Sequence, residues 1–448
     1  MATPHPALHP AEAGLPPPSP VAAEHGARVL AHLRAQIAQA PATGNAEQTI
    51  SFADFMQQVL YAPGLGYYAA GATKLGGGGD FVTAPELSPL FGATLADVFA
   101  PLADRGVIEL GAGTGKLARD FLAASPQSRY RILEVSADLR ERQQQTLSGL
   151  PVTWLDTLPA RIDGLVLANE VLDAVPCEVV RFQAGRYEQA RVAAVGEGFE
   201  WRWLPLLDGP LLTAARHRVP AVEGYQSEIN PEAEALVATL ASRLGDGALC
   251  FIDYGFPRRE YYLAERRGGT LACHYQQRVH FDPLILVGLQ DVTAHVDFTA
   301  MAEAAVDGGA GVICYATQAQ FLLHGGLLNR LQAAQFASDA ARANALNAAQ
   351  KLVSPAEMGE LFKVLVVGKG AAVEQLAQSR WPMARLLRAY ISRLPLNSKR
   401  FQLWPQDPDT VVWLPPWSQL FIWVASRVKS LMPLRVMMLT TPAMASEP

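Results

Sequence analysis

The chain has 448 residues, half of them apolar, so it can bury a large core and is not a disordered protein. Its 37 basic and 42 acidic residues give a formal net charge of -5, which argues against a general nucleic-acid-binding protein. The four cysteines are widely spaced and form no C-x-x-C pair, so neither a disulfide framework nor a thiolate metal cluster is expected. This cysteine usage suits a reducing compartment and favours a cytoplasmic location.

The first residues form a proline-rich lead. Seven prolines stand between residues 4 and 20, and because proline forbids helix interiors we expect residues 1–26 to be disordered. The lead has no apolar stretch like that of a secretory signal and no arginine like those of a transit peptide. Helical patterns follow at residues 27–40 and 51–60, and Ser51 is a suitable N-cap for the second.

A regular alternation of strands and helices begins near residue 107, after a glycine-rich loop at 76–79 and a helix at 90–102. Short buried strands are predicted at residues 107–110, 130–135, 152–155 and 165–168, with helices at 116–124 and 137–147. Such alternation implies a parallel sheet covered on both faces. Right-handed crossovers then bring the carboxyl ends of the strands to one edge of the sheet, where ligands bind.

The second half of the chain interrupts this alternation and then resumes it. An antiparallel insertion of three strands is predicted at residues 179–182, 189–194 and 200–204. Further strands of the main sheet are predicted at residues 248–254, 312–316 and 362–367, with helices at 231–243, 318–331 and 334–352. The fold class is therefore α/β, with a mostly parallel seven-stranded sheet, helices on both faces, and insertions at about residues 178–243 and 258–298.

Residues 371–448 form a separate compositional unit. They carry nine Lys or Arg against four Asp or Glu, and five of the eight tryptophans. The apolar run at 420–425 is too short to span a bilayer, so no membrane span is expected. The composition favours a basic, tryptophan-rich tail of irregular structure over an anchor at a membrane surface.

A glycine-rich turn after the first main-sheet strand is the first sign of function. The pattern consists of Glu109, Gly111, Gly113 and Gly115, directly before a helix. A Walker A loop would need glycine at position 110 and Ser or Thr at 117, and a dinucleotide fingerprint would need glycine at 116; this sequence has none of these. The pattern instead suits S-adenosylmethionine, which carries no phosphate. The alternative is a glycine turn that serves only tight packing.

An acidic residue at the end of the next strand supports a nucleoside cofactor. Glu134 stands at the carboxyl end of the predicted strand at 130–135, where a carboxylate can accept hydrogen bonds from both ribose hydroxyls. We therefore expect Glu134 to bind the ribose.

Polar residues at the end of the fourth strand are the candidates for holding a methyl acceptor. Asn169, Glu170 and Asp173 stand where the sheet edge faces the reacting group. If the acceptor is a guanidinium, a carboxylate can bind it bidentately. Methyl transfer needs an aligned nucleophile rather than covalent help from the protein. For Asp173, a helix N-cap is an equally good interpretation.

Other polar clusters are weaker signals. Asp253 stands at a strand end, and His295 and Asp297 share one face of a strand and could, with Asp291, imitate a metal site. A loop histidine hydrogen-bonded to a nearby carboxylate is the favoured interpretation, and no metal site is expected.

These residues resemble the MidA-type methyltransferases, a family that includes a mitochondrial complex I assembly factor that methylates a protein arginine. The resemblance spans roughly residues 28–370 and is carried by motifs at 79–86, 109–115, 169–176, 227–230, 252–255, 291–298 and 358–365. It implies a class I methyltransferase fold, S-adenosylmethionine as methyl donor, and a protein arginine as acceptor in the mitochondrial members. It further implies that Asp80 and Thr83 approach the amino-acid end of the cofactor or the acceptor.

The sequence thus predicts an S-adenosylmethionine-dependent methyltransferase acting on a protein side chain, with arginine favoured. The methyltransferase domain would span residues 27–370, and its insertions would form a lid that recognises a protein client such as a respiratory-complex subunit. A nicotinamide or flavin oxidoreductase and a non-catalytic assembly factor with the same fold are the alternatives. The oligomeric state is left open, a homodimer included.

Overall fold

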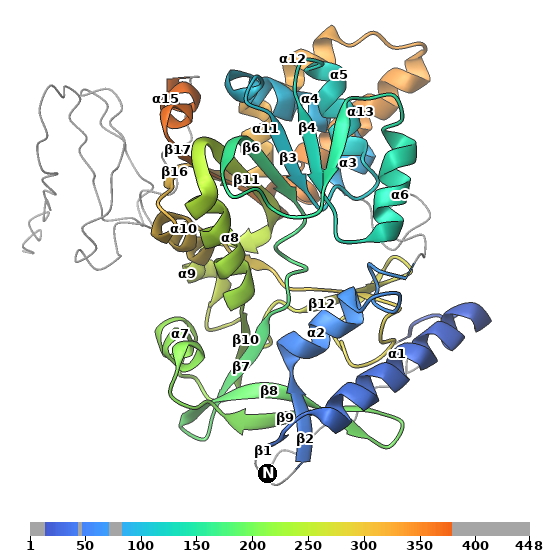
Figure 1. Cartoon of the computed structure of the whole chain (residues 1–448), viewed down its shortest axis with the longest axis vertical. Helices are drawn as coiled ribbons and strands as arrows, with labels where there is room; N and C mark the ends of the chain where they lie inside the picture. Colours follow the sequence, from blue (N-terminus) through green and yellow to red (C-terminus); the bar gives the residue numbers. More distant parts are fainter. Residues whose placement is uncertain (1–13, 44–46, 71–82, 379–448) are drawn as a thin grey trace, which may run out of the picture.

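A computed structural model describes residues 14–43, 47–70 and 83–378 (Figure 1). Figure 1 shows two halves, with the main sheet and its helices in the upper half and a second, antiparallel sheet below. The lead up to residue 13, the glycine-rich loop at 76–79 with Asp80, and the tail from residue 379 lie outside the described residues. The first eight residues of the predicted tail are described and form helix α15, Ala371–Gln378, which buries Ala372 and Leu376 in the main core, so the prediction of an irregular tail from residue 371 is wrong for these residues.

Seven strands form the main sheet of the described chain in the order β16-β17-β11-β6-β3-β4-β5, and short β15 pairs with β11. Their bounds are β3 Val107–Leu110, β4 Tyr130–Leu133, β5 Val152–Leu155, β6 Ile162–Asn169, β11 Leu244–Phe256, β15 Val296–Asp297, β16 Gly311–Thr317 and β17 Phe362–Lys369. The strands from β11 to β5 are parallel, whereas β17 runs antiparallel to both of its neighbours. The predicted α/β fold with a mostly parallel, seven-stranded sheet is confirmed.

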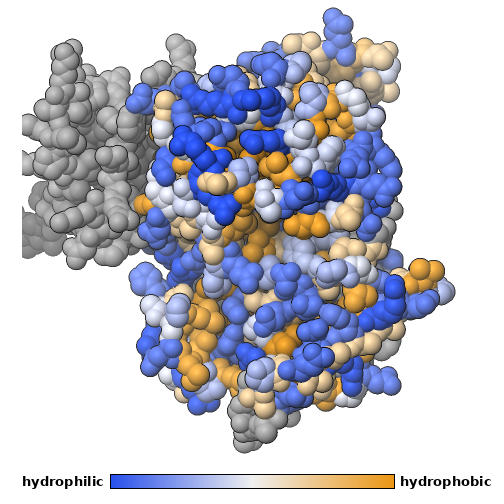
Figure 2. All heavy atoms as spheres, in the orientation of Figure 1, coloured by the Kyte–Doolittle hydropathy of each residue, from blue (hydrophilic) through white to orange (hydrophobic). Residues whose placement is uncertain are grey.

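Helices cover both faces of this sheet, because successive strand residues point to opposite sides. Val107 packs in a cluster with residues of α4, α5 and α11, whereas its neighbour Ile108 packs with α8 and α10. The helices of this half are α3 Ala84–Leu87, α4 Pro89–Val98, α5 Lys116–Ala124, α6 Ala137–Thr146, α8 Pro231–Arg243, α10 Phe298–Asp307, α11 Gln318–His324, α12 Leu327–Ala333, α13 Asp339–Val353, α14 Met358–Leu361 and α15 Ala371–Gln378. Figure 2 shows mainly hydrophilic side chains on the visible outer face, with apolar ones scattered among them.

Two predicted helices are interrupted. The helix expected at 90–102 ends at Val98 and is followed by a short 3-10 turn, Ala100–Leu102, because Pro101 cannot donate the next helical hydrogen bond. The helix expected at 318–331 divides into α11 and α12 at a glycine pair. Gly326 adopts a φ of +94°, a left-handed conformation that only glycine accepts readily.

The accessory sheet has the order β1-β2-β8-β7-β10, with β9 beside β8, and all its pairings are antiparallel. Its strands are β1 Ala42–Thr43, β2 Glu47–Ser51, β7 Glu178–Gln183, β8 Arg186–Val195, β9 Gly198–Pro205 and β10 Tyr225–Ile229. The three predicted insertion strands correspond to β7, β8 and β9. The N-terminal strand β2 joins them, which the sequence did not predict.

Helices from the N-terminal segment cover this second sheet. Helices α1, Pro20–Gln39, and α2, Phe52–Tyr61, bury Leu33 and Phe55 against Val192 of β8, and α7, Pro210–Arg218, packs elsewhere on the sheet. The start of α1 corrects the predicted disordered lead, because residues 20–26 are helical. Pro20 occupies the first turn, where a missing N–H costs nothing, and the Ser19 hydroxyl caps the helix.

A small third sheet lies in the second insertion. It consists of β12 Ala272–Tyr275, β13 Arg278–His280 and β14 Asp291–Thr293, and α9 Arg258–Tyr261 precedes it. Within the described ranges, no helix is both long and apolar enough to cross a bilayer.

Candidate active site

A cavity of about 290 Å³ opens at the carboxyl ends of β3, β4 and β6. The strand order reverses between β3 and β6, since the chain first builds β4 and β5 on one side of β3 and then crosses to the other. Ligands of doubly wound sheets bind at such a reversal. Seven of the ten predicted site residues line the cavity: Thr83, Glu109, Gly111, Gly113, Glu134, Asn169 and Glu170.

The glycine turn between β3 and α5 forms one wall of the cavity. Gly111, Gly113 and Gly115 have φ values of +60°, +53° and +84°, so each occupies the left-handed region that favours glycine. Gly111 and Gly113 line the cavity, but Gly115 does not. A Cβ at Gly115 would lie 3.2 Å from Leu147 Cδ1, so this glycine serves the turn and its packing rather than ligand contact.

Glu134, directly after β4, presents a carboxylate to the cavity. Its Oε1 accepts the backbone N–H of Ser136 at 2.9 Å, and its Oε2 accepts Nε2–H of Gln143 at 2.8 Å. Burial raises the pKa of this carboxyl, and these hydrogen bonds oppose the shift. Each carboxylate oxygen has a second lone pair, so Glu134 is fixed in place and still able to accept hydroxyl donors.

Glu109 lies deeper, inside β3. Its side chain is buried, and its Oε2 accepts the hydroxyl of Tyr130 at 2.9 Å. Burial raises the pKa of Glu109 to about 8, with the Tyr130 hydrogen bond opposing the shift. Glu109 therefore forms the neutral or weakly ionised floor of the cavity near pH 7.

A third acidic residue, Glu86, was not predicted as a site residue. It lies on α3, lines the cavity, and accepts hydrogen bonds from Thr114 Oγ1 at 2.5 Å and Lys116 Nζ at 2.9 Å. These contacts fix α3 to the glycine turn. Thr83 stands at the N-cap position of α3, lines the cavity, and makes no side-chain capping bond there.

Asn169 and Glu170 form the opposite end of the cavity. Glu170 has a φ of +54°, a strained conformation for a non-glycine residue of the kind found at functional sites. Its Oε1 accepts Nδ2–H of Asn169 at 3.0 Å and its Oε2 accepts the hydroxyl of Tyr254 at 3.2 Å. Burial, together with the negative charge of Asp173, raises the pKa of Glu170 to about 8. The Oδ1 of Asn169 is buried without a hydrogen-bond partner.

Asp173 is buried just behind this end and does not line the cavity. The helix N-cap interpretation is wrong, since the residues after it form turns rather than a helix. Burial and the charges of Asp253 and Asp291 raise the pKa of Asp173 well above its ordinary value, and its Oδ1 has no hydrogen-bond partner.

Asp253, the other strand-end candidate, organises the turn that holds these residues. Its Oδ2 accepts the backbone N–H groups of Val171, Leu172 and Asp173 at 3.2, 2.9 and 3.3 Å. Three donors on one buried oxygen hold the whole turn after β6 against β11.

Two tyrosines from the N-terminal segment complete the cavity, and sequence analysis missed both. Tyr61 donates to the carbonyl oxygen of Ala174 at 3.0 Å, and Tyr68 donates to Asp291 Oδ1 at 2.9 Å. Their rings stack with centroids 5.6 Å apart, and both line the cavity. The only available signal was a cluster of aromatic residues at positions 61–68, which is equally typical of a core.

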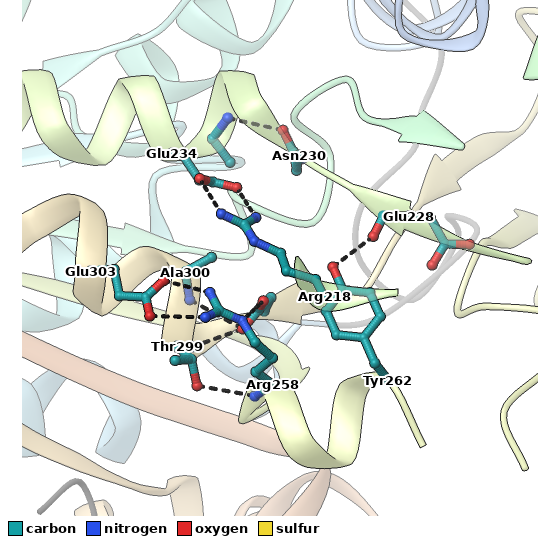
Figure 3. A network of polar contacts seen from close by, with 11 residues as sticks. Arg218, Glu228, Asn230, Glu234, Arg258, Tyr262, Thr299, Ala300 and Glu303 are labelled. Atoms are coloured by element: carbon teal, nitrogen blue, oxygen red, sulfur yellow. Dashed lines mark hydrogen bonds and ion pairs between the residues drawn. The ribbon is translucent and has the colours of Figure 1, made fainter. Parts of the chain in front are cut away.

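The remaining motifs are structural. Glu228 of β10 is buried and accepts hydrogen bonds from Thr270 and Leu271 of the second insertion, which holds that loop in place. Figure 3 shows how two arginines join the insertions to the main half: Arg218 pairs with Glu234 of α8, and Arg258 pairs with Glu303 of α10.

His295 and Asp297, two of the three residues that could imitate a metal site, have other roles. Asp297 caps α10 through the N–H groups of Thr299 and Ala300 and also binds Arg258. The ring of His295 stacks on Phe256 with centroids 5.3 Å apart. These two side chains are therefore committed to helix capping and aromatic packing.

Comparison with known proteins gives matches over most of the chain. Residues 90–315 match the model of a family described as S-adenosyl-L-methionine-dependent methyltransferases. A solved structure from Burkholderia thailandensis, bound to S-adenosyl-homocysteine, is 42% identical and superposes with a TM-score of 0.76 over 81% of this chain and 98% of its own. Protein arginine methyltransferase NDUFAF7, mitochondrial, is 28% identical in Danio rerio, covering 78% of this chain and 90% of its own, and 27% identical in Homo sapiens, covering 70% and 78%.

These relatives correct one prediction. The cysteines predict a reducing compartment and favour the cytoplasm, but the curated relatives are named mitochondrial proteins, so the prediction of a cytoplasmic location is wrong. Cysteine usage does not separate the two locations, because it reports only that no disulfide framework is needed.

Proposed function

The chain belongs to the family of S-adenosylmethionine-dependent methyltransferases, and we propose that its acceptor is the side chain of a protein arginine. Family, fold and methyl donor agree with the prediction from sequence, and the nicotinamide or flavin alternative is thereby set aside. Arginine is the acceptor named for the mitochondrial relatives. The acidic end of the cavity is the observation on this chain that carries the proposal.

The residues of the cavity fit the cofactor. Glu134 would accept the ribose hydroxyls, and Gly111 and Gly113 allow the backbone to approach the ligand closely. The unpartnered Oδ1 of Asn169 can accept a donor such as the amino group of the methionine moiety, and Thr83 lies on the same cavity wall. When bound, the cofactor supplies a methyl group on a sulfonium sulfur, an electrophile that needs only an aligned nucleophile.

The other end of the cavity suits a cation. Glu170, Asp173 and Asp253 are carboxyl groups at or just behind it, and none of them forms an ion pair with another described residue. Buried carboxylates without a cation are costly, so this end would be stabilised by a guanidinium entering it. We assign Glu170 the binding contact and Asp173 a supporting charge behind it.

Glu170 would also handle the proton of the reaction. The acceptor nitrogen must lose one proton when it gains a methyl group. Without a cation beside it, Glu170 with a pKa of about 8 is mostly protonated near pH 7, and the charge of an entering guanidinium would favour its carboxylate form, whose Oε2 Tyr254 holds in place. Glu170 would therefore orient the guanidinium through its N–H groups and accept the proton that leaves.

The accessory half would recognise the client. We propose that the N-terminal segment and the insertions at about 178–243 and 258–298 form a lid on the methyltransferase domain at 27–370, because they supply Tyr61 and Tyr68 to the lining of the cavity and Asp291, which accepts the Tyr68 hydroxyl behind it. A protein of a respiratory complex is the proposed client, after the relatives.

The test is transfer of labelled methyl groups. The protein is incubated with methyl-labelled S-adenosylmethionine and a mitochondrial or bacterial membrane-protein extract, and labelled residues are located by mass spectrometry. We expect methylarginine that disappears in Glu170→Gln. Label on lysine, histidine or a small molecule would overturn the arginine assignment. Binding of S-adenosyl-homocysteine without any transfer would favour the non-catalytic assembly factor.

A further inference from the structure

A buried glutamine joins the two parts of the cofactor end. Gln143 lies on α6, has no exposed surface and does not line the cavity. Its Nε2 donates to the carbonyl oxygen of Gly113 at 3.0 Å and to Oε2 of Glu134 at 2.8 Å. Its Oε1 accepts Nε1–H of Trp154 at 2.9 Å. One side chain therefore connects the glycine turn after β3 to the carboxylate after β4.

The chemistry of the three partners fixes the orientation of this amide. The indole of Trp154 can only donate, so the amide oxygen must face it. The Gly113 carbonyl oxygen and Glu134 Oε2 act as acceptors here, so both face the NH₂ group. No other residue type of this size offers two donors on one side and an acceptor on the other.

We infer that Gln143 is a positioning residue for the methyl donor, holding Glu134 and the glycine turn in the mutual arrangement that binds the cofactor. The glycine turn has three left-handed residues and therefore little conformational restraint of its own. The Ser136 N–H fixes only one oxygen of Glu134. Gln143 restrains both at once. The inference rests on the proposed role of Glu134 in binding the ribose.

The experiment measures the affinity for S-adenosyl-homocysteine by titration calorimetry, which needs no acceptor. Gln143→Leu should weaken binding about 10- to 100-fold, the range expected when hydrogen bonds to a charged group are lost. The matched control is Gln318→Leu. Gln318 is also a fully buried glutamine and donates to the Leu352 carbonyl at 2.9 Å, but it lies away from the cavity. Its removal should change affinity less than twofold.

A second variant separates positioning from folding. In Gln143→Glu, the new carboxylate faces Glu134 Oε2 and the Gly113 carbonyl, so acceptors oppose acceptors. As the pH falls from about 8 to 6, a shared proton restores one hydrogen bond, and the affinity deficit relative to the wild type should shrink. The Gln143→Leu deficit should show no such recovery. Trp154→Phe, which removes the indole N–H and part of the ring and so frees the amide oxygen, should cost about threefold and remains informative if Gln143→Leu does not fold.

The Glu134→Ala variant distinguishes failure of this inference from failure of the ribose assignment. If Glu134→Ala binds as tightly as the wild type, the role proposed for Glu134 is wrong. If Glu134→Ala weakens binding while Gln143→Leu, Gln143→Glu and Trp154→Phe leave it within twofold, Gln143 is a packing residue only and the inference is overturned.

Discussion

The two ends of the cavity are built in different ways. The part of the cofactor end proposed to hold the ribose comes from one continuous stretch of chain, residues 109–143, in which two consecutive strand–turn–helix units bring Gly113 and Glu134 to the same side chain, that of Gln143. The acceptor end gathers side chains from four distant segments: Tyr61 and Tyr68 of the N-terminal segment, Glu170 after β6, Tyr254 of β11 and Asp291 of β14. Local sequence therefore specifies this part of the site, whereas the acceptor end is completed only when the accessory half docks against the main sheet.

The two ends also differ in how they hold their carboxylates. Glu134 receives a hydrogen bond on each oxygen and faces the cavity, an arrangement prepared for hydroxyl donors. At the acceptor end, Glu170 and Asp173 lie close enough for each charge to raise the pKa of a neighbouring carboxyl, and no described cation pairs with them. The first end is satisfied without a ligand, and the second gains most from a cationic one.

The strongest test of this difference between the two ends of the cavity is a variant that disables only one of them. Glu170→Gln keeps the size of the side chain but removes its charge and its ability to accept a proton. Methyl transfer should fall about 100-fold or more, the usual contribution of a catalytic base, while affinity for S-adenosyl-homocysteine changes less than twofold. Rates from labelled donor and affinities from calorimetry give the two readouts.

A matched control for that variant lies in the accessory sheet. Glu178 of β7 accepts Nε2–H of Gln189 at 2.8 Å and, like Glu170, has a pKa raised by burial. Glu178→Gln should leave both readouts near wild type. Equal losses of transfer and cofactor affinity in Glu170→Gln would show that the two ends are not separable.

The same division explains what sequence could predict. The strands at 107–110 and 152–155 and the helix at 116–124 have the predicted bounds, because short buried strands flanked by turn residues leave few alternatives. Spacing alone placed Glu134 and the glycines at the cavity, since each follows a strand by a fixed number of residues. Gly115 matched the pattern but serves the turn.

The sequence could not predict the residues whose role depends on contacts with distant segments of the chain. Tyr61 and Tyr68 read as ordinary core aromatics, and Gln143 is one of three consecutive glutamines on a polar helix. Asp173 looked like a cap because its local sequence permits one, but Asp253, on another strand, holds that turn instead. In each case the role of the residue depends on hydrogen bonds between segments that are distant in the sequence, and such bonds leave no periodic pattern in the sequence.

A second test asks whether the buried carboxyl group of Glu109, at the cofactor end, makes the free energy of unfolding fall as the pH rises. Burial raises the pKa of Glu109 to about 8, from an ordinary value near 4.5. Between these values the folded chain keeps a proton that the unfolded chain has lost, so stability falls as pH rises, by up to about 1.4 kcal/mol per pH unit. Glu109→Gln cannot ionise, and its oxygen can still accept the Tyr130 hydroxyl.

Urea denaturation at pH 5, 6, 7 and 8 checks this expectation. The free energy of unfolding should decline less steeply with pH in Glu109→Gln than in the wild type, so the variant gains relative stability toward pH 8. Parallel curves for the two proteins would mean that Glu109 ionises normally in the folded state, and the floor of the cavity would then be charged at neutral pH.

The smallest expected effect is that of a variant of Tyr68, which contacts residues at both ends of the cavity. The backbone carbonyl of Tyr68 accepts the Ser136 hydroxyl at 2.6 Å, beside Glu134, while its own hydroxyl donates to Asp291. Tyr68→Phe keeps the ring and the cofactor-side contact and removes only the bond to Asp291. We expect kcat/KM for methyl transfer to fall about 3- to 10-fold, as for one buried hydrogen bond, with S-adenosyl-homocysteine affinity unchanged.

Tyr187→Phe provides the comparison for this variant. Tyr187→Phe also removes one tyrosine hydrogen bond, that to the Val219 carbonyl oxygen at 2.8 Å, but Tyr187 lies within the accessory sheet. Both variants should lose about 1 kcal/mol of stability, and only Tyr68→Phe should lose transfer. If Tyr68→Phe instead weakened cofactor binding as much as transfer, docking of the accessory half would shape both ends together, and the cofactor end could no longer be regarded as the product of its local sequence alone.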